Sequence, residues 1–592
     1  MYFTGDDRID SLLFSSEPHW NGPGVFNAPA SVTFSFAQFG TPEGLDNDGQ
    51  APFTAQQAAA ARLALQAWSD VANIDFTEVT DLGIFAGDSF TRGDINFINE
   101  KIIDDDPTLL TLAYAFIPFS ADPKGTERAG DLHVNDIDEN FDSLAPGGQA
   151  FLVLMHELGH ALGLNHPTDG SVTLPDNEVN DRFTVMAPFI DENVFAAQGV
   201  FAETPMPYDI LAIQHLYGQN KAHNAGNTTY TFDDHQLIYE TIWDGGGNDT
   251  IDASASDRRA IINLKQGSYS SIGTSPSGLG EDAVDNLAIA FDVNIENARG
   301  GAGSDSIGGN GVANKLVGNA GLDALSGLGG DDRLEGGKDN DRLAGGEGND
   351  LLIGGSGADV MIGGDGDDRY KVDNRGDVVL DNGTGTDTVV STVNFSLTAK
   401  IETLLLTGTA DIDGTGTNGG NRIVGNRGDN TLTGNRGNDT LDGGSGDDVL
   451  IGGPGRDKLV GSTGDDRFAY TEEGDGTFVA ANVVRGGADG DRVIGFVSGD
   501  DKFRFDDTAF DPAGDVGTGL LTLGDDFSVI GVAYDGTNPG ANANHAAGEA
   551  SFIFSTADST LYYDADGAGA GYTVVARIID GTDVAATDIS IV

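Results

Sequence analysis

The sequence has 592 residues, with 31 basic and 94 acidic side chains, a formal net charge of −63, 87 glycines and no cysteine. This length predicts several domains, and the acidity argues against nucleic acid or an anionic membrane as a partner and favours divalent cations. The lack of cysteine excludes disulfides, thiolate zinc sites and cysteine nucleophiles. No apolar run reaches about 18 residues, so insertion into a membrane is not expected.

Residues 1–220 predict a mixed domain of strands and helices. The first residues are acidic and carry no apolar segment, so no signal peptide of the general secretory type is expected. Alternating apolar residues predict the strands, and a capping box at Thr54 and Gln57 predicts a helix that runs to Val71. The predicted strands cover 31–36, 94–98 and 112–117, and two further helices are predicted over 149–164 and 208–217.

A cluster of histidines lies in the second predicted helix. His156 and His160 are four residues apart, so both imidazoles lie on one helical face and can reach one metal ion. Gly163 lets the chain turn back, and His166 then supplies a third nitrogen. Three neutral nitrogens leave a fourth zinc position for water, from which Glu157 can take a proton. The spacing predicts a hydrolytic zinc site.

From Gly300 the sequence is periodic. Nine-residue units of the form G-G-x-G-x-D-x-U-x, where U is large and apolar, fill 300–371 and 416–469. Two units make one turn of a parallel β-helix, so side chains 18 residues apart stack about 4.8 Å from each other. Stacked carboxylates repel unless a hard cation lies between them, which predicts calcium. The sixth-position aspartates are Asp305, Asp323, Asp332, Asp341, Asp350, Asp359, Asp368, Asp439, Asp448, Asp457 and Asp466.

These units resemble the RTX calcium-binding nonapeptide, and the histidine pattern is that of the metzincin metallopeptidases. Within the metzincins the chain resembles the serralysins. Pro167 follows the third histidine as in that family, and 207–218 is similar to the helix that closes its catalytic domain. The residues Ala113, Tyr114, Ala115 and Phe116 are similar to the edge strand along which serralysins lay the substrate backbone.

The resemblance implies an α+β metzincin catalytic domain, with a mixed twisted sheet and active-site helices, followed by an all-β parallel β-roll. The expected parts are the catalytic domain at 1–220, a connector at 221–299, roll blocks at 300–371 and 416–469 with a spacer or insertion at 372–415, and a β-rich C-terminal region with a secretion signal at 470–592. By the same resemblance, further calcium ligands are Asn224, Gly226, Thr228, Asp244, Gly246, Gly247, Asp249, Glu296, Gly301, Gly303 and Asp305.

Two features depart from the serralysin pattern. The expected Met-turn centres on Met186, but Pro188 stands where serralysins have a tyrosine that is a fifth zinc ligand. The zinc ion is therefore expected to be bound by the three histidines and water, without a tyrosine, and Tyr208 on the closing helix is expected to pack rather than to act as a replacement ligand. The C-terminus, 588–592, is similar to the serralysin export signal but is interrupted by Ser590.

The resemblance implies a secreted bacterial zinc endopeptidase with one catalytic zinc ion and several structural calcium ions. It implies protein or peptide substrates, Glu157 as the base, and a type I exporter that reads the C-terminus and makes an N-terminal signal peptide unnecessary. A monomer that binds neither nucleic acid nor the membrane interior is expected. The alternative is a non-enzymatic calcium-binding surface or adhesion protein with a degenerate peptidase domain.

Overall fold

The computed structural model describes most of the chain, in two compact units at 1–310 and 311–592. The described residues are 4–14, 20–21, 25–37, 50–81, 94–100, 113–117, 130–135, 143–169, 171–187, 200–275, 280–470, 477–480, 491–496, 501–505, 519–520, 527–530, 551–557, 559–564, 571–579, 583–585 and 588–591. Among these residues, no helix has both the length and the apolar character needed to cross a membrane.

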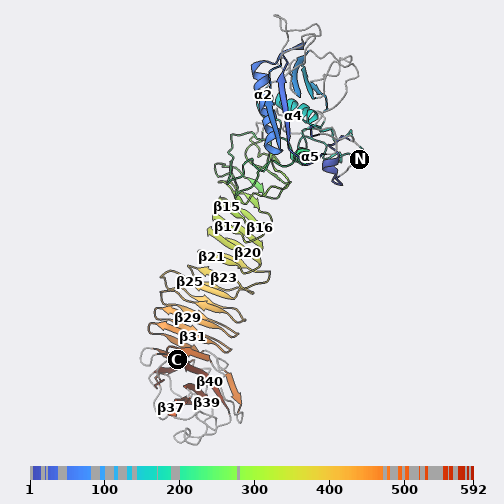
Figure 1. The fold of residues 1–592 in the computed structure, drawn as a ribbon. Helices are drawn as coiled ribbons and strands as arrows, with labels where there is room; N and C mark the ends of the chain where they lie inside the picture. Colours follow the sequence, from blue (N-terminus) through green and yellow to red (C-terminus); the bar gives the residue numbers. More distant parts are fainter. Residues whose placement is uncertain are drawn as a thin grey trace. The chain divides into compact units, whose positions relative to one another are not determined.

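The first unit begins with a mixed sheet and the helices that pack near it (Figure 1). Its helices are α1 (Asp7–Asp10), α2 (Ala55–Val71), α4 (Gln149–Ala161) and α5 (Pro207–Tyr217). Its strands are β1 (Ala30–Phe36), β2 (Gln50–Ala51), β3 (Ile74–Glu78), β4 (Ile95–Glu100), β5 (Ala113–Ala115) and β6 (Asp131–Asn135). The sheet order is β3-β1-β4-β6-β5, with β2 on β4, and only β2 and β5 run antiparallel to their partners.

The long helix α2 supports the helix that carries the histidines. Its predicted capping box is present, because the Thr54 hydroxyl accepts from the Gln57 N–H at 3.3 Å and the Gln57 side chain accepts from the Thr54 N–H at 2.7 Å. Trp68 is fully buried and donates its indole N–H to the Met155 carbonyl at 3.2 Å. Because Met155 immediately precedes the first histidine, this contact fixes α4 against α2.

The rest of the first unit is a connector of short strands. Its strands are β7 (Thr229–Thr231), β8 (Glu240–Ile242), β9 (Thr250–Asp252), β10 (Ile261–Asn263), β11 (Tyr269–Ser270), β12 (Leu287–Ile289), β13 (Asn297–Arg299) and β14 (Ser306–Gly308). Four of the pairings, β7 with β9, β9 with β13, β8 with β12 and β10 with β14, are parallel. Parallel pairing of such short strands is the arrangement that the repeats continue in the second unit.

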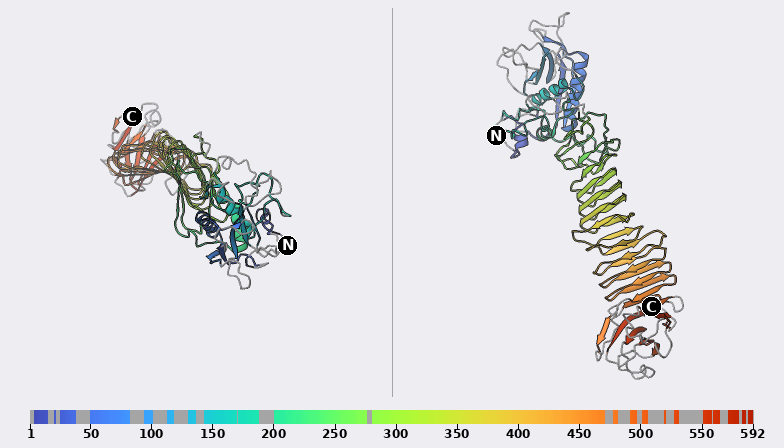
Figure 2. Two further views of the ribbon diagram at one scale, coloured as in Figure 1. Left: turned by 90° about the horizontal axis from the view of Figure 1, so that it is seen from above. Right: turned by 180° about the vertical axis from the view of Figure 1, so that it is seen from behind.

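The second unit begins with a parallel roll (Figures 1 and 2). Its strands up to residue 372 are β15 (Lys315–Ala320), β16 (Ala324–Gly329), β17 (Arg333–Lys338), β18 (Arg342–Glu347), β19 (Leu351–Ser356), β20 (Val360–Asp365) and β21 (Arg369–Val372). Partners are 18 residues apart, as in Leu316 with Leu334 and Leu334 with Leu352, and these leucines are fully buried. The predicted fold class, a metzincin-like α+β domain followed by a parallel β-roll, is confirmed.

The segment 372–415, expected to be a spacer, carries strands of the same arrangement. They are β22 (Val378–Leu380), β23 (Thr388–Ser391), β24 (Phe395–Ser396), β25 (Thr403–Leu406) and β26 (Gly414–Thr415). Strand β21 pairs with β23, β23 with β25, and β25 with the following strand β27 (Arg422–Val424), all in parallel. On this side of the roll the strand pairing therefore passes through the segment, although the glycine pattern is lost there, whereas on the other side one sheet ends at β22 and a separate sheet begins at β24.

The last part of the chain is rich in strands among its described residues. They are β27 (Arg422–Val424), β28 (Thr431–Thr433), β29 (Thr440–Ser445), β30 (Val449–Ile451), β31 (Lys458–Thr463), β32 (Arg467–Tyr470), β33 (Thr477–Ala480), β34 (Asp491–Ile494), β35 (Lys502–Phe505), β36 (Gly519–Leu520), β37 (Phe527–Ile530), β38 (Ser551–Ser555), β39 (Thr560–Asp564), β40 (Gly571–Ile579) and β41 (Ile589–Ile591). Strand β41, which holds Ser590, pairs in parallel with β35. The segment expected to be the export signal is thus part of a sheet.

Candidate active site

The three predicted histidines come together at the end of α4. His156 Nε2 lies 3.2 Å from His166 Nε2, and His160 Nε2 lies 3.1 Å from the same atom. Nitrogens bound to one tetrahedral zinc ion at about 2.0–2.1 Å are separated by roughly 3.3 Å. Among the described residues, these three form the one group of histidine and acidic side chains whose ligand atoms all lie within 4.8 Å of one another. The donor set therefore fits a zinc ion.

Each histidine is held by its other ring nitrogen. His156 Nδ1 donates to the Val185 carbonyl at 2.7 Å and His160 Nδ1 donates to the Leu164 carbonyl at 2.8 Å. Because a carbonyl can only accept, each Nδ1 carries the proton and each Nε2 presents its lone pair to a metal. Burial lowers the pKa of His160 to about 4 and that of His156 well below its usual range, which favours the neutral, metal-binding form.

The chain reversal between the second and third histidines depends on Gly163. Helix α4 ends at Ala161, three residues earlier than the sequence predicts, and Gly163 follows with φ of 103°. A side chain would strain the backbone there, whereas glycine adopts this conformation freely. The Leu164 N–H then donates to the Gly159 carbonyl at 2.8 Å, which directs the chain toward His166.

The N-terminal segment holds this turn from outside, which no sequence pattern indicated. The Asn165 N–H donates to the Leu12 carbonyl at 2.9 Å, and Leu13 forms an antiparallel bridge with Leu164. The Trp20 indole N–H donates to the Ala161 carbonyl at 3.0 Å. The backbone in front of His166 is therefore fixed by residues about 150 positions away in the sequence.

His166 has a carboxylate partner that sequence reasoning missed. Its Nδ1 lies 2.8 Å from Asp169 Oδ2, and the Asp169 side chain is 55% exposed. The spacing of three residues between His166 and Asp169 could have indicated this contact, because a carboxylate that accepts from a ligating imidazole commonly supports a metal site. Asp169 thus orients the third ligand.

We expect Asp169→Ala to weaken zinc binding by about 10–100-fold, because loss of a carboxylate behind a ligating histidine has an effect of this size. The zinc dissociation constant is measured by competition with a chromophoric chelator. Asp176→Ala, which removes an exposed carboxylate from the same loop, is the matched control and is expected to leave the constant unchanged. Equal affinities for both variants would contradict the role of Asp169.

Glu157 is buried beside the histidines. Burial raises the pKa of Glu157 to about 8, and its carboxyl accepts a hydrogen bond from the Ala115 N–H of β5. Its Oε2 has no hydrogen-bond partner among the described residues. Strand β5 lies at the edge of the sheet. Tyr114 of this strand stacks on His133 with ring centres 4.6 Å apart.

Met186 lies under the histidines, where a Met-turn was expected. It is fully buried, and a Cβ atom added to Gly159 would clash with its sulfur, so glycine is needed inside α4 for this contact. The turn is tied to α5 by Asp209, whose Oδ2 accepts from the Val185 N–H at 2.7 Å and whose Oδ1 accepts from the Thr184 hydroxyl. Pro188, the predicted departure from the serralysin Met-turn, lies outside the described residues.

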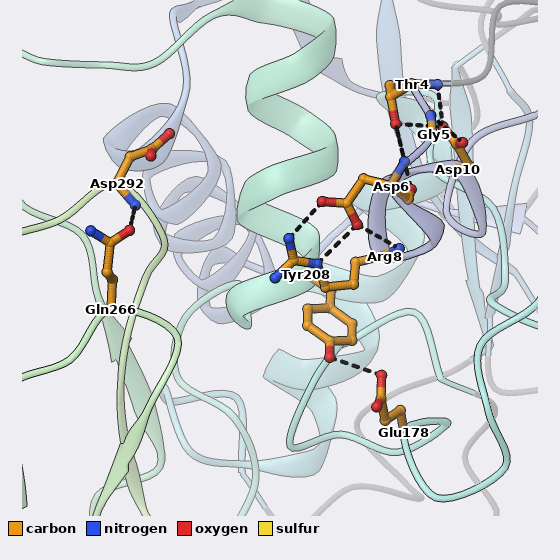
Figure 3. Close-up of polar contacts among 9 residues, drawn as sticks. All are labelled: Thr4, Gly5, Asp6, Arg8, Asp10, Glu178, Tyr208, Gln266 and Asp292. Atoms are coloured by element: carbon orange, nitrogen blue, oxygen red, sulfur yellow. Dashed lines mark hydrogen bonds and ion pairs between the residues drawn. The ribbon is translucent and has the colours of Figure 1, made fainter.

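The hydroxyl of Tyr208 binds a carboxylate that is not part of the histidine site. Its hydroxyl donates to Glu178 Oε2 at 2.8 Å, and its ring stacks on Phe183 with centres 5.1 Å apart. Figure 3 shows the tyrosine directed at this carboxylate, next to the Asp6–Arg8 ion pair of the N-terminal segment. A tyrosine bound in this way does not supply a replacement zinc ligand.

The calcium ligands expected in the connector come together through hydrogen bonds. The Asp249 N–H donates to Glu296 Oε2 at 2.8 Å, and the Thr228 N–H donates to Asp249 Oδ1 at 2.8 Å. Asp244 Oδ1 accepts from the Gly246 N–H at 2.8 Å. Asp249 Oδ2 is buried without a hydrogen-bond partner in the described chain, and burial together with Asp244 and Glu296 raises the pKa of Asp249 to about 6. A site that is lined by oxygen atoms, one of which has no hydrogen-bond partner, fits a calcium ion.

Other predicted ligands of the connector lie in the same loops. The Thr228 hydroxyl donates to the Gly226 carbonyl at 3.0 Å, and Gly247 packs closely on that carbonyl. Asn224, with φ of 48°, donates from its side chain to the Tyr230 hydroxyl at 3.1 Å. Gly301 and Gly303 pack on the backbone of 256–259, and the Gly301 N–H donates to Asp305 Oδ2 at 2.7 Å.

The aspartates of the roll stack as predicted. In both repeat blocks the N–H of one aspartate donates to Oδ1 of the aspartate 18 residues later, for example at 2.8 Å from Asp332 to Asp350 and 2.9 Å from Asp350 to Asp368. The same contacts join Asp323, Asp341 and Asp359, Asp439 and Asp457, and Asp448 and Asp466. The second oxygen is buried without a hydrogen-bond partner in the described chain at Asp332, Asp341, Asp350, Asp359, Asp368, Asp439 and Asp448. Such bare oxygens fit calcium ions between the turns.

Comparison with known families gives three matches along the chain. The Matrixin peptidase model matches residues 45–218, and the model for the C-terminal part of M10 serralysins matches 208–407. The RTX calcium-binding nonapeptide repeat matches 415–450 and 442–470. The histidine site thus lies within the first match, and the connector and first repeats lie within the second.

Curated relatives cover the same part of the chain. Serralysin A of Dickeya chrysanthemi is 38% identical over 307 residues, which are 48% of this chain and 60% of that protein. Serralysin of Proteus mirabilis is 34% identical over 341 residues, 52% of this chain and 65% of the relative. Metallopeptidase AprA of Pseudomonas marginalis is 34% identical over 344 residues, 53% of this chain and 67% of the relative. The alignments therefore span about two thirds or less of each of these relatives.

Proposed function

Because the chain belongs to the serralysin family of metallopeptidases, we propose that it is a zinc endopeptidase that hydrolyses peptide bonds of extracellular proteins. The observation that carries this proposal is the convergence of three Nε2 atoms, two of which lie within 3.2 Å of His166 Nε2, next to a buried carboxyl group. Each of these nitrogens is left free for a metal because the Nδ1 of the same ring has its own partner.

Glu157 would move the proton in this reaction. When bound, zinc would supply a Lewis acid that polarises a substrate carbonyl and makes a water molecule more acidic. The positive charge of a bound zinc ion would lower the raised pKa of Glu157, so that its carboxylate would accept the proton of that water and later donate it to the departing amine. Two features support this role: the Ala115 N–H holds the carboxyl in place, and Oε2 has no partner in the described chain.

Strand β5 would align the substrate. It lies at the sheet edge with its backbone paired to β6 on one side, and on the other side its backbone has no strand partner in the described chain. Apart from the Ala115 N–H, which binds Glu157, these outer groups suit an extended peptide. The Ala115 N–H already touches Glu157, which places the backbone of a bound peptide near the proton acceptor. This arrangement supports a role for 113–116 in substrate binding.

A casein assay tests the proposal. The full chain, kept in calcium, is assayed with and without phenanthroline, which removes zinc through nitrogen ligands and leaves calcium sites occupied. We expect activity that is lost with the chelator and restored by zinc. A chain that binds zinc and calcium but cleaves no protein substrate would instead support the alternative, a non-enzymatic calcium-binding surface protein.

We infer that the chain acts outside the cell after export through a type I system. The RTX match and the serralysin relatives support this inference. In the folded structure Asp588 is fully buried and accepts from the Lys502 ammonium at 3.1 Å, and the residues that follow form β41. An exporter would therefore have to bind 588–592 before this region folds.

A further inference from the structure

The C-terminal end of α4 lies between two of the three histidines. His160 is the last residue but one of the helix, and His166 follows the chain reversal at Gly163. The last four carbonyl groups of a helix have no donor within the helix, so each needs a partner from elsewhere. Three of these carbonyls accept from backbone N–H groups of the turn itself at 2.8–2.9 Å, those of Leu158, Gly159 and His160.

The next two carbonyls accept from aromatic side chains that lie far away in the sequence. The Trp20 indole N–H donates to the Ala161 carbonyl at 3.0 Å, and the Tyr217 hydroxyl donates to the Leu162 carbonyl at 2.7 Å. Ala161 and Leu162 are fully buried, so water does not replace either donor. A buried carbonyl that loses its donor is unfavourable, and the turn has to rearrange to satisfy it.

The two aromatic residues are bonded to each other. The Trp20 backbone N–H donates to the Tyr217 hydroxyl at 3.3 Å, so this hydroxyl accepts from one side and donates to the other. Tyr217 is the last residue of α5 and is fully buried. The Trp20 ring lies against Gly130, directly before β6, where an added Cβ atom would clash with the ring. Trp20 therefore contacts α4, α5 and the start of β6 at once.

The turn held in this way determines the relative position of two histidines. His160 Nδ1 donates to the Leu164 carbonyl at 2.8 Å, so a shift of the turn rotates the second histidine as well as displacing the third. His160 Nε2 and His166 Nε2 lie 3.1 Å apart. The distances from the ligand atoms to a metal ion have to be met within about 0.2 Å, so a small shift of the turn is enough to weaken the site.

On the basis of the proposed function, which supplies zinc as the bound ion, we propose that Trp20 and Tyr217 are positioning residues of the metal site. They close the carbonyl end of α4 and so hold the turn that sets His166 against His160. Asp169 acts on the His166 ring, whereas these two side chains act through the backbone. Zinc binding then depends on docking of the N-terminal segment, because that segment carries Trp20. Without the docked segment the turn has other arrangements, and the apparent zinc affinity falls with the fraction of chains in the binding-competent one.

Zinc affinity tests Trp20. Trp20→Phe keeps an aromatic ring but removes the indole N–H. We expect the zinc dissociation constant of the full chain in calcium, measured by competition with a chromophoric chelator, to rise about 2–10-fold, the effect of losing one hydrogen bond. The matched control is Trp243→Phe, which removes an indole N–H that donates to the Asn220 carbonyl at 3.0 Å, and its constant is expected to be unchanged. A constant that is unchanged in Trp20→Phe, or raised equally in both variants, would overturn the proposal.

Cobalt absorption tests Tyr217 separately. Cobalt(II) occupies zinc sites, and its visible absorption bands depend on the geometry of the ligands. We expect Tyr217→Phe, which removes only the hydroxyl, to shift these bands and to weaken zinc binding by a similar factor, while the circular dichroism of the chain is retained. Unchanged bands or an unchanged zinc affinity would exclude Tyr217 as a positioning residue. Both experiments measure metal binding and not hydrolysis, so their result is separate from that of the casein assay, which decides the proposed function.

Discussion

Glu157→Gln is expected to lower kcat/KM for peptide hydrolysis by about 10²–10⁴-fold while zinc remains bound, because loss of a general base has an effect of this size. Glutamine keeps the shape of the side chain and can still accept the hydrogen bond from the Ala115 N–H. It cannot take a proton from water at neutral pH. The three histidine nitrogens and their Nδ1 partners are unaffected, so the metal site should persist.

Two measurements on the same preparation check this expectation. Steady-state hydrolysis of a casein peptide gives kcat/KM, and atomic absorption gives the zinc content per chain. Glu178→Gln is the matched control, because it replaces a carboxylate that accepts from Tyr208 and is expected to retain full activity. A Glu157→Gln protein with near-normal turnover, or one without stoichiometric zinc, would show that the carboxylate has a different role.

The zinc site could be predicted because its spacing is local. Two histidines four residues apart meet on one helical face whatever surrounds the helix, and Gly163 reverses the chain within one turn. The aspartate columns were predictable for the same reason, since a fixed period of nine residues determines which side chains stack. The structure confirms the resulting contacts across 18 residues at 2.8–2.9 Å.

The residues that support the site were not predictable in this way. Asp209 reaches the Met-turn from α5, and Leu12 reaches the turn in front of His166 from the opposite end of the domain. Such contacts depend on tertiary packing and leave no periodic signal in the sequence. Asp169 is local, but an aspartate three residues after a histidine is common, so its spacing alone does not identify a partner.

The segment 372–415 shows which features the roll requires. Strand pairing needs an inward apolar residue on each strand, and Val389 and Leu404 supply it, both fully buried. Strand pairing does not need the full glycine motif. A search for that motif therefore misses 372–415, although strands in this segment are paired. Asp387 before β23 and Glu402 before β25 continue the hydrogen-bonded column of acidic side chains, although the spacing changes to 19 and 15 residues.

Removal of calcium is expected to unfold most of the roll in residues 311–592. Stacked carboxylates repel when they are ionised, and their bare oxygens lose solvation when they are buried. Burial and the neighbouring aspartates raise the pKa of Asp341, Asp350 and Asp368 to about 7, because both disfavour the charged form of these carboxyls. Calcium relieves both penalties, so binding and folding are coupled.

Circular dichroism of the full chain, titrated with calcium from chelator, measures this coupling. The Glu157→Gln variant is used so that unfolded segments are not digested by the protein itself. We expect the β signal to rise cooperatively with calcium and not with magnesium, because magnesium requires a smaller, near-octahedral shell and gives up its water molecules reluctantly. A β signal of full size in chelator would contradict the coupling. It would mean that the buried leucines of β17 and β19 stabilise the roll enough to outweigh the repulsion along its aspartate columns.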